Sequence, residues 1–399
     1  MSNITAEQKM TQQKEELERE LNTIVDSQDL PPANIMVAGI TGTGKSTLIN
    51  AVFGSQMAAT GSGKPVTEQI NEYKNEDIPI RIWDTVGLEL DNAKTEMSIR
   101  NIKKTIADKS SSKDKYDRVH AIWYCINSGS SRYQGAELNF IKELHDIGIP
   151  FIIVLTQCTG AEEEVNALED EIKRINASMG MNDIQIVQVL AMPVKFRGMS
   201  DPIPAFGLED LVNVTLECLP SFIKSGFIAA QKVSQNEKRR ECEEIIEKYV
   251  EAAQNGFWDK VPLINIITTD NKIMAMFKKI AKMYNTEIEA EAITKILNEC
   301  GVDSKNNFEG LVNPFYKGYS RKITNLLERK KKEGFSASFV NEDNNRSARM
   351  IAFYGYTFVD SIEELWKIFT EDQLKQVDIV VTQLVSIINR KLKERQTRR

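Results

Sequence analysis

The sequence predicts an α/β fold, in which helices flank a mostly parallel sheet, with a helix before this domain and an all-α domain after it. From Asn34 onward, short apolar runs alternate with amphipathic stretches, as is typical of strands that alternate with helices. Beyond about Ser225 the strand signal ends and only helical periodicity continues. We therefore expect a helix in residues 1–30, an α/β domain in 31–225 and a helical domain in 226–399.

The leading helix is expected over Thr5–Val25. This segment is rich in Glu, Gln, Lys and Leu, and its apolar residues Leu17 and Leu21 have helical spacing. The helix should end before Pro31 and Pro32, because proline cannot continue a helix.

Short apolar runs define the strands of the α/β domain. Those near Phe151 lack polar alternation, as expected for strands that are covered on both faces. The predicted strands are Asn34–Ala38, Glu68–Tyr73, Ile78–Trp83, Val119–Ile126, Pro150–Leu155 and Ile184–Leu190. The predicted helices are Lys45–Phe53, Lys94–Asp108, Gly135–Ile147, Glu162–Met179 and Leu208–Leu219.

Helical spacing dominates the remainder of the chain. Ile273, Phe277, Ile280 and Tyr284, for example, lie on one face of a helix. The predicted helices here are Val233–Ala253, Asn271–Tyr284, Ile288–Cys300, Pro314–Lys332, Arg346–Phe369 and Gln373–Glu394.

Composition excludes several classes of function. The 51 Lys and Arg against 57 Asp and Glu leave a net charge of −6, whereas a general nucleic-acid binder needs a basic surface. Unbroken apolar stretches such as Phe151–Leu155 are far shorter than the ~20 residues of a membrane-spanning helix. The two histidines, His120 and His145, lie on different predicted elements, which argues against a histidine metal site or histidine base. Five scattered cysteines without a Cys-x-x-Cys pair are typical of reduced thiols, so we expect a cytoplasmic protein, with peripheral membrane contact left open.

The segment from Gly39 to Thr47 carries the strongest chemical signal. It fits G-x-x-x-x-G-K-[ST] and lies between a predicted strand and a predicted helix, which is the context of a phosphate-binding P-loop. Backbone N–H groups and the helix N-terminus would surround the phosphates, Lys45 would reach the β- and γ-phosphates, and Ser46 would ligate Mg²⁺. The nucleotide-binding candidates here are Gly39, Thr41, Gly42, Thr43, Gly44, Lys45, Ser46 and Thr47.

A second motif follows the third predicted strand. Asp84 and Gly87 form D-x-x-G, and Asp84 lies 39 residues after Lys45. Between the motifs, Gly54–Glu68 is a Gly-, Ser- and Thr-rich loop. Thr67 lies 21 residues after Ser46, about where a Mg²⁺-coordinating threonine is expected, and Thr60 is the alternative.

Together these motifs resemble the Era-like G proteins of the translation-factor-related class, over about Asn34 to Leu219. The resemblance implies a Mg²⁺-dependent switch that binds GTP or GDP and orders its loops with GTP. It implies that Ser46, Thr67 and Asp84 hold Mg²⁺, and that the Gly87 amide contacts the γ-phosphate. Lys45, Thr67 and Gly87 are the implied catalytic residues.

The base-reading segment departs from the family pattern [NT]-K-x-D. The matching residues are Thr156, Gln157, Cys158 and Thr159, so that Gln157 replaces the lysine and Thr159 replaces the carboxylate. A hydroxyl offers one acceptor oxygen where a carboxylate offers two, and it carries no charge, which weakens guanine selectivity. Ala191 is a candidate for the last base-contacting loop.

Two further departures concern hydrolysis. Leu88 stands where Ras-like proteins carry a water-orienting glutamine, which implies slow intrinsic hydrolysis or a catalytic group from elsewhere; Glu89 and Arg132 are polar candidates. Gly42 stands where some Era-like proteins use an asparagine to hold K⁺, so no K⁺ stimulation is expected through that site.

The helical region faintly resembles that of the YcjF type of Era-like proteins. Their membrane-associated segment corresponds to Lys330–Arg349, which is highly polar here. The tail Arg390–Arg399 has a net charge of +5 and could contact an acidic membrane surface. The alternatives to a partner-directed switch are therefore a dynamin-like or interferon-inducible GTPase that assembles on membranes, and a pseudo-GTPase interaction module. Homo-oligomers through either domain are compatible with all three.

Overall fold

The computed structural model divides the chain into two compact units. The first spans Asp29–Gln235 and the second begins at Asn236. The residues that the structure describes are 30–54, 57–60, 64–67, 70–75, 78–85, 92–110, 112, 114–129, 135–254, 269–286, 288, 325–326, 342–374 and 376–397. The predicted helix Thr5–Val25 lies outside them.

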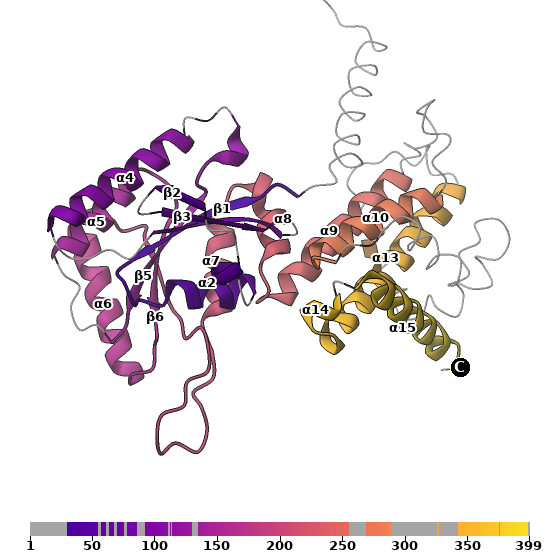
Figure 1. Ribbon diagram of the computed structural model, residues 1–399. Coiled ribbons are helices and arrows are strands. Elements are labelled where there is room, and N and C mark those ends of the chain that lie inside the picture. Colours follow the sequence, from indigo (N-terminus) through magenta and orange to yellow (C-terminus); the bar gives the residue numbers. More distant parts are fainter. Residues whose placement is uncertain are drawn as a thin grey trace, which may run out of the picture. The chain divides into compact units, whose positions relative to one another are not determined.

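The first unit is built on a seven-stranded sheet with the order β2-β3-β4-β1-β5-β6-β7 (Figure 1). Strands β4, β1, β5, β6 and β7 are parallel, whereas β2 and β3 form an antiparallel edge. The strands are β1 Ala33–Gly39, β2 Lys64–Thr67, β3 Ile70–Asn75, β4 Ile78–Thr85, β5 Ala121–Asn127, β6 Phe151–Thr156 and β7 Gln185–Gln188. This is the predicted mostly parallel α/β fold, and it is the fold of a P-loop NTPase G domain.

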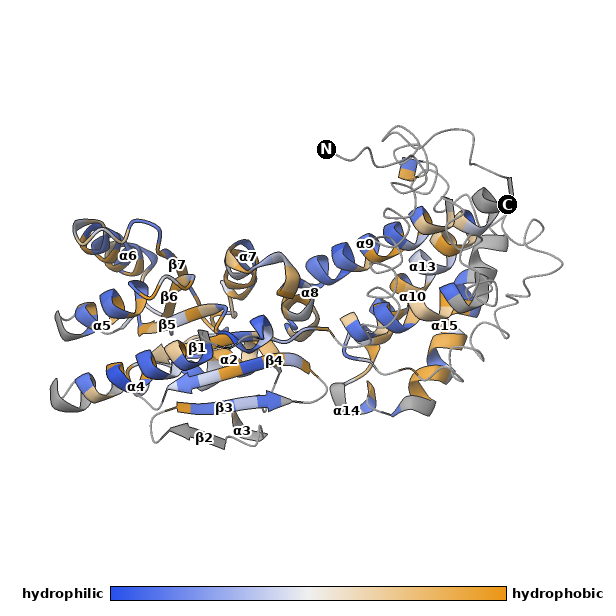
Figure 2. Ribbon diagram, turned by 90° about the horizontal axis from the view of Figure 1, so that it is seen from above, coloured by the Kyte–Doolittle hydropathy of each residue, from blue (hydrophilic) through white to orange (hydrophobic). Residues whose placement is uncertain are grey.

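Helices cover both faces of this sheet (Figures 1 and 2). On one face, Tyr124 and Ile126 of β5 pack with the buried side chains of α4, α5 and α6. On the other, Trp123 stacks on Phe53 of α2, with ring centroids 5.8 Å apart. The helices are α2 Lys45–Phe53, α3 Met57–Thr60, α4 Asn92–Ser110, α5 Gly135–His145, α6 Glu162–Ser178, α7 Leu208–Cys218 and α8 Ser221–Ala230, with the 3-10 turn η1 Lys115–Asp117.

The prediction of a loop over Gly54–Glu68 is wrong in part. It contains α3 and strand β2, which pairs with β3 through Lys64 and Glu72. A Gly- and Ser-rich composition predicts a turn, but backbone pairing at a sheet edge overrides that local preference. The predicted strand Glu68–Tyr73 corresponds to β3.

The domain boundary differs from the one expected at residue 225. Residue 225 lies inside α8, whose Phe227 packs edge-on against Phe53 and Trp123. Beyond α8, the Lys232 amide donates to Val52 O, at 2.8 Å, and Ser234 Oγ bonds Glu209. These contacts keep the chain with the sheet as far as Gln235.

The second unit is helical in the part that the structure describes. The stacked rings of Phe277 and Phe358 lie 4.0 Å apart in its core, and Arg239 pairs with Asp360 and Glu363. The prediction of one helix over Gln373–Glu394 is wrong, because two helices occupy this segment. The helices are α9 Gln235–Gln254, α10 Thr269–Met283, α13 Glu342–Ile368, α14 Glu371–Leu374 and α15 Val377–Thr397.

Most residues of the predicted helices Ile288–Cys300 and Pro314–Lys332 lie outside the described ranges, and so does most of Lys330–Arg349. None of the helices within the described ranges combines the length and apolar character needed to cross a membrane.

Candidate functional site

A glycine loop joins β1 to α2 at the carboxyl end of the sheet. Gly39 leaves β1 with φ 145°, and a Cβ there would lie 2.4 Å from Cys125 O, so only glycine fits. Gly44 has φ 83° and directly precedes α2, whose first turn carries no side-chain cap. The free N–H groups at this helix start provide a binding site for an anion.

Lys45 and Asp84 are a buried pair of charged residues beside this loop. Lys45 Nζ donates to Gly39 O and Ile40 O, at 3.0 and 3.2 Å. Burial lowers the pKa of Lys45, and the charge of Asp84 opposes that shift. Burial raises the pKa of Asp84 to about 6, partly offset by Lys45. Each charge is held in a poorly solvated place, which favours ligands that bring the opposite charge.

Two buried oxygens near the loop lack partners. Asp84 Oδ1 and Thr85 Oγ1 have no hydrogen-bond partner among the residues that the structure describes. A buried acceptor left unpaired is costly. A hard divalent cation such as Mg²⁺ prefers oxygen ligands, so the donor set fits Mg²⁺.

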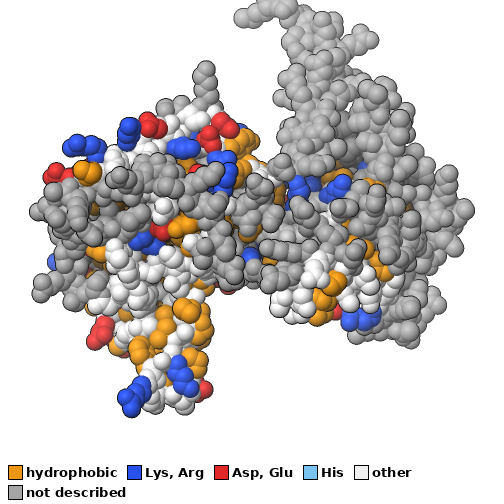
Figure 3. All heavy atoms as spheres, in the orientation of Figure 1, with side chains coloured by type: hydrophobic (Ala, Val, Ile, Leu, Met, Phe, Trp, Pro, Cys, Tyr) orange, Lys and Arg blue, Asp and Glu red, His pale blue; other side chains and the backbone are white. Residues whose placement is uncertain are grey.

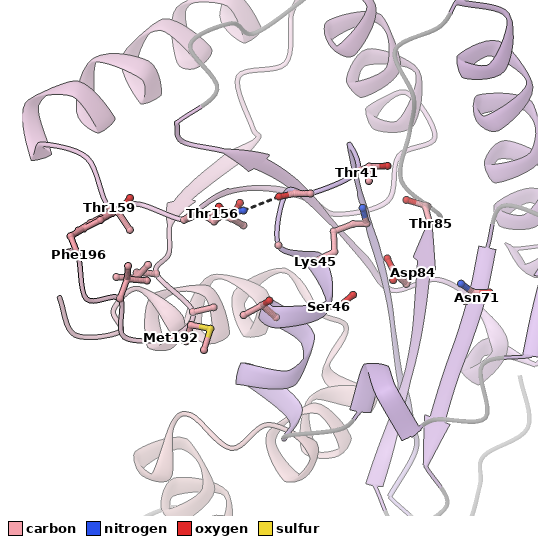
Figure 4. Close-up of a pocket in the computed structure, with 17 residues that line it drawn as sticks. Thr41, Lys45, Ser46, Asn71, Asp84, Thr85, Thr156, Thr159, Met192 and Phe196 are labelled. Carbon is pink, nitrogen blue, oxygen red and sulfur yellow. Dashed lines mark hydrogen bonds between the residues drawn. The ribbon is translucent and has the colours of Figure 1, made fainter. Parts of the chain in front are cut away.

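A cavity of about 790 Å³ connects these groups, a size suited to a nucleotide (Figure 4). One end holds the glycine loop, Lys45, Asp84 and Thr85, and Asn71 of β3 adds an amide to it. The other end is lined by the residues after β6 and by the segment after β7. Both ends therefore belong to the first unit.

The segment after β6 is tied to the glycine loop. Thr156 Oγ1 lies 2.5 Å from Thr43 O and 3.1 Å from Ile126 O. Gln157 has a left-handed backbone, with φ 55°, and its Nε2 donates to Gly42 O at 2.8 Å. The base-reading candidates are thus held at a fixed distance from the phosphate-binding loop.

Most of the predicted binding residues line this cavity. They are Thr41, Gly42, Gly44, Lys45, Ser46, Thr47, Asp84, Thr156, Gln157, Thr159 and Ala191. Gly39 and Thr43 act through the backbone contacts given above. Thr67 ends β2 and Thr60 ends α3, but their side chains are not described, so the choice between them stays open. Gly87, Leu88, Glu89 and Arg132 lie outside the described residues.

Sequence reasoning missed several lining residues. Asn71 and Thr85 come from β3 and β4, and Thr85 could have been suspected because it directly follows Asp84 at a strand end. Met192, Val194 and Phe196 come from the segment between β7 and α7. The signal there was weak, since an apolar, proline-rich stretch resembles an ordinary connection.

A comparison with protein families covers the part of the chain that carries the glycine loop, Lys45 and Asp84. Residues 34–157 match the family described as 50S ribosome-binding GTPase. The match supports a P-loop GTPase domain in this part of the chain. No curated protein matches the chain in sequence.

Solved structures with a similar fold include three G proteins. The bacterial selenocysteine-specific elongation factor EF-Sec is 22% identical with a TM-score of 0.31, covering 47% of this chain and 28% of its own. A probable GTP-binding protein engB is 18% identical with a TM-score of 0.33, and the match covers 47% of this chain and 98% of engB. The G domain of the T. maritima FeoB iron transporter is 14% identical with a TM-score of 0.29, and the match covers 46% of this chain and 97% of that domain. This chain thus spans less than a third of the elongation factor. Scores this low carry no functional argument.

Proposed function

We propose that this chain is a Mg²⁺-dependent GTP-binding and GTP-hydrolysing switch of the Era-like class, and that its helical unit couples the nucleotide state to a partner or to self-assembly. The observation that carries the proposal is the buried Lys45 amine at the glycine-loop end of the cavity, near an Asp84 oxygen that has no hydrogen-bond partner among the described residues. The family match over residues 34–157 supports guanine nucleotides.

Phosphate binding uses groups that are already in position. The Lys45 amine is held by Gly39 O and Ile40 O, and it can donate to phosphate oxygens from there with little rearrangement. The anion also restores charge balance around a desolvated ammonium. Loop N–H groups and the start of α2 would add further donors for the phosphates.

Mg²⁺ fits the hydroxyl of Ser46 and the carboxylate of Asp84, with Thr67 as the third proposed ligand. When bound, it supplies charge neutralisation across the β- and γ-phosphates. The role of the protein is to keep Asp84 ionised and aimed at that place, which the nearby Lys45 charge favours.

Hydrolysis would proceed by in-line attack of water on the γ-phosphorus, which breaks the bond to the bridging oxygen and yields GDP and inorganic phosphate. Lys45 and the loop amides stabilise the charge that develops on the phosphate oxygens. Leu88 cannot orient the attacking water, so we expect a slow intrinsic rate, below about 10⁻² s⁻¹.

Substitution of Lys45 tests the assignment. Lys45→Ala removes the cation at the phosphate end, so the affinity for GTP should fall on the order of a hundredfold or more. Isothermal titration with GTP, GDP, ATP and ADP, with and without Mg²⁺, measures this, and multiple-turnover phosphate release measures hydrolysis. Micromolar or tighter GTP binding that depends on Mg²⁺ is the expected wild-type result.

A matched control is Lys173→Ala, which removes an exposed lysine from α6 at a distance from the loop. It should bind GTP as the wild type does. Near-normal GTP affinity in Lys45→Ala would refute the assignment, and the absence of phosphate release with intact binding would favour a pseudo-GTPase.

A further inference from the structure

A projecting finger follows the last strand of the sheet. It comprises residues 191–206, between β7 and α7, and forms the extended loop at the lower edge of Figures 1 and 3. Two antiparallel bridges join its arms, Leu190 with Phe206 and Val194 with Ile203. Backbone N–H groups donate in both directions across each bridge, at 2.8 to 3.1 Å. The finger is therefore an ordered element rather than a simple connection.

The root of the finger is joined to the base-reading segment. The Cys158 amide donates to Val189 O at 3.3 Å, and the Val189 amide donates to Leu155 O at 2.7 Å. Gly207 closes the finger with φ 76°, where a Cβ would lie 1.8 Å from Gln188 O. These contacts hold the root of the finger beside the base-reading segment.

Large apolar side chains of the finger are exposed. The exposed fractions are 56% for Met192, 45% for Phe196, 47% for Met199 and 41% for Phe206. Two of the four, Met192 and Phe196, line the nucleotide cavity, together with Val194. Figure 4 shows Phe196 beside Thr159 and Met192 farther from it, both on the side of the cavity away from Asp84. Exposed apolar side chains at the mouth of a cavity mark a surface that a ligand covers.

The polar groups at this end are few. Gln157 already donates its amide to Gly42 O, and Thr159 offers a hydroxyl where a carboxylate would read guanine. A purine ring placed there meets apolar surface instead. An aromatic ring can stack on a base, and a methionine sulfur packs well against the edge or face of an aromatic ring.

We infer that Met192 and Phe196 form an apolar wall for the nucleobase, so that base binding here depends on ring contact as much as on polar reading of the base edge. This inference rests on the proposed function, because the wall serves the same nucleotide. The wall increases the affinity for every purine nucleotide, GTP and ATP alike, and adds nothing to the affinity for a triphosphate without a base.

Serine substitutions test the wall. Met192→Ser and Phe196→Ser, separately and together, remove the apolar surface from exposed positions, so the fold should be preserved. Met199→Ser is the matched control, since Met199 is exposed to a similar degree on the same finger but does not line the cavity. The affinities to be measured, by isothermal titration with Mg²⁺, are those for GTP, ATP and inorganic tripolyphosphate.

We expect Phe196→Ser to weaken GTP and ATP binding about tenfold to a hundredfold, the range for loss of one base-stacking aromatic ring. Tripolyphosphate affinity should stay within about twofold, and Met199→Ser should behave as the wild type. Unchanged GTP affinity in the double variant would overturn the inference. Equal losses of affinity for GTP and for tripolyphosphate would overturn it too. A wild-type chain that binds neither tripolyphosphate nor nucleotide overturns the proposed function itself, and the wall with it.

Methionine oxidation gives a second readout on the unmodified chain. Hydrogen peroxide converts exposed methionine to its sulfoxide, and mass spectrometry reports the rate at each residue. Saturating GTP should slow the oxidation of Met192 severalfold and leave Met199 unchanged, whereas tripolyphosphate should protect neither. Equal oxidation of Met192 with and without GTP would overturn the inference.

Discussion

Under the proposed function, Thr159 is the residue that most limits discrimination between bases. Its side chain lines the cavity beside Gln157, and a hydroxyl offers the base edge a single uncharged acceptor. Thr159→Asp adds a carboxylate, which can accept two N–H bonds from guanine and repels the acceptor edge of adenine. Hydrogen bonds to a charged group contribute about 1.5–3 kcal/mol, so the preference for GTP over ATP should rise about tenfold to a hundredfold.

The ratio of the GTP and ATP dissociation constants measures this gain. Thr159→Asn is the matched control, since it has nearly the shape of aspartate without the charge and should change the ratio much less. A ratio that does not move in Thr159→Asp would mean that the base does not reach residue 159.

The residues around the phosphate end were the predictable part of the site. The glycine loop follows β1, and Asp84 lies near the end of the neighbouring parallel strand β4; the carboxyl ends of the two strands meet at one edge of the sheet. Spacing along the chain is enough to bring them together. The contact of Met192 and Phe196 with the cavity depends on how a long segment turns back on itself, which spacing does not determine. Thr67 and Gly87 stay predictions.

At the scale of elements, strands and helices with strong patterns were predictable, and the exceptions have physical causes. The predicted helix Lys45–Phe53 is confirmed as α2, because a glycine precedes it and another ends it. The predicted helix Leu208–Leu219 corresponds to α7, but α8 was missed, since Pro220 separates two short helices in one apolar stretch. Edge strand β2 was missed because pairing, rather than composition, makes it a strand.

Helix α10 carries the charge of Lys279 at a cost in folding stability. Lys279 of α10 is largely buried, and this burial, aided by the positive charge of Lys248, lowers its pKa to about 8. In the unfolded chain the pKa is about 10.4, so between these values the unfolded state binds more protons and stability rises with pH. Below about pH 8 both states are protonated and the full penalty remains.

Lys279→Met should therefore stabilise the helical unit at pH 7, by roughly 1–2 kcal/mol after allowance for solvent screening. The gain should shrink as the pH rises from about 8 and vanish above about 10.5. Urea unfolding at pH 7 and pH 10.5 measures it, with Lys367→Met on the exposed side of α13 as the control. A gain of equal size at both pH values would show that lost charge is not its cause.

At the scale of the whole chain, the division at Gln235 predicts two unfolding events. Each unit has its own buried core, around Trp123 in the first and around Phe277 in the second. The division expected near residue 225 falls inside α8, which the sequence did not predict as a helix, and the packing of Phe227 on Phe53 and Trp123 assigns α8 to the first unit.

A ligand stabilises the unit that binds it, so Mg²⁺ with GTP at a hundred times the dissociation constant should add about 2.7 kcal/mol to the first unit alone. Calorimetry should show one transition rising by about 5–10 °C while the other moves far less.

Gly355→Val should act on the transition of the helical unit, because a Cβ added at residue 355 of α13 would lie 2.7 Å from Ile246 Cγ1 and 3.1 Å from Met276 Cε. Overpacking there costs about 1–3 kcal/mol, which lowers the transition of the helical unit and leaves the GTP affinity unchanged. A single transition that both GTP and Gly355→Val shift by similar amounts would contradict the division, since the two units would then unfold as one.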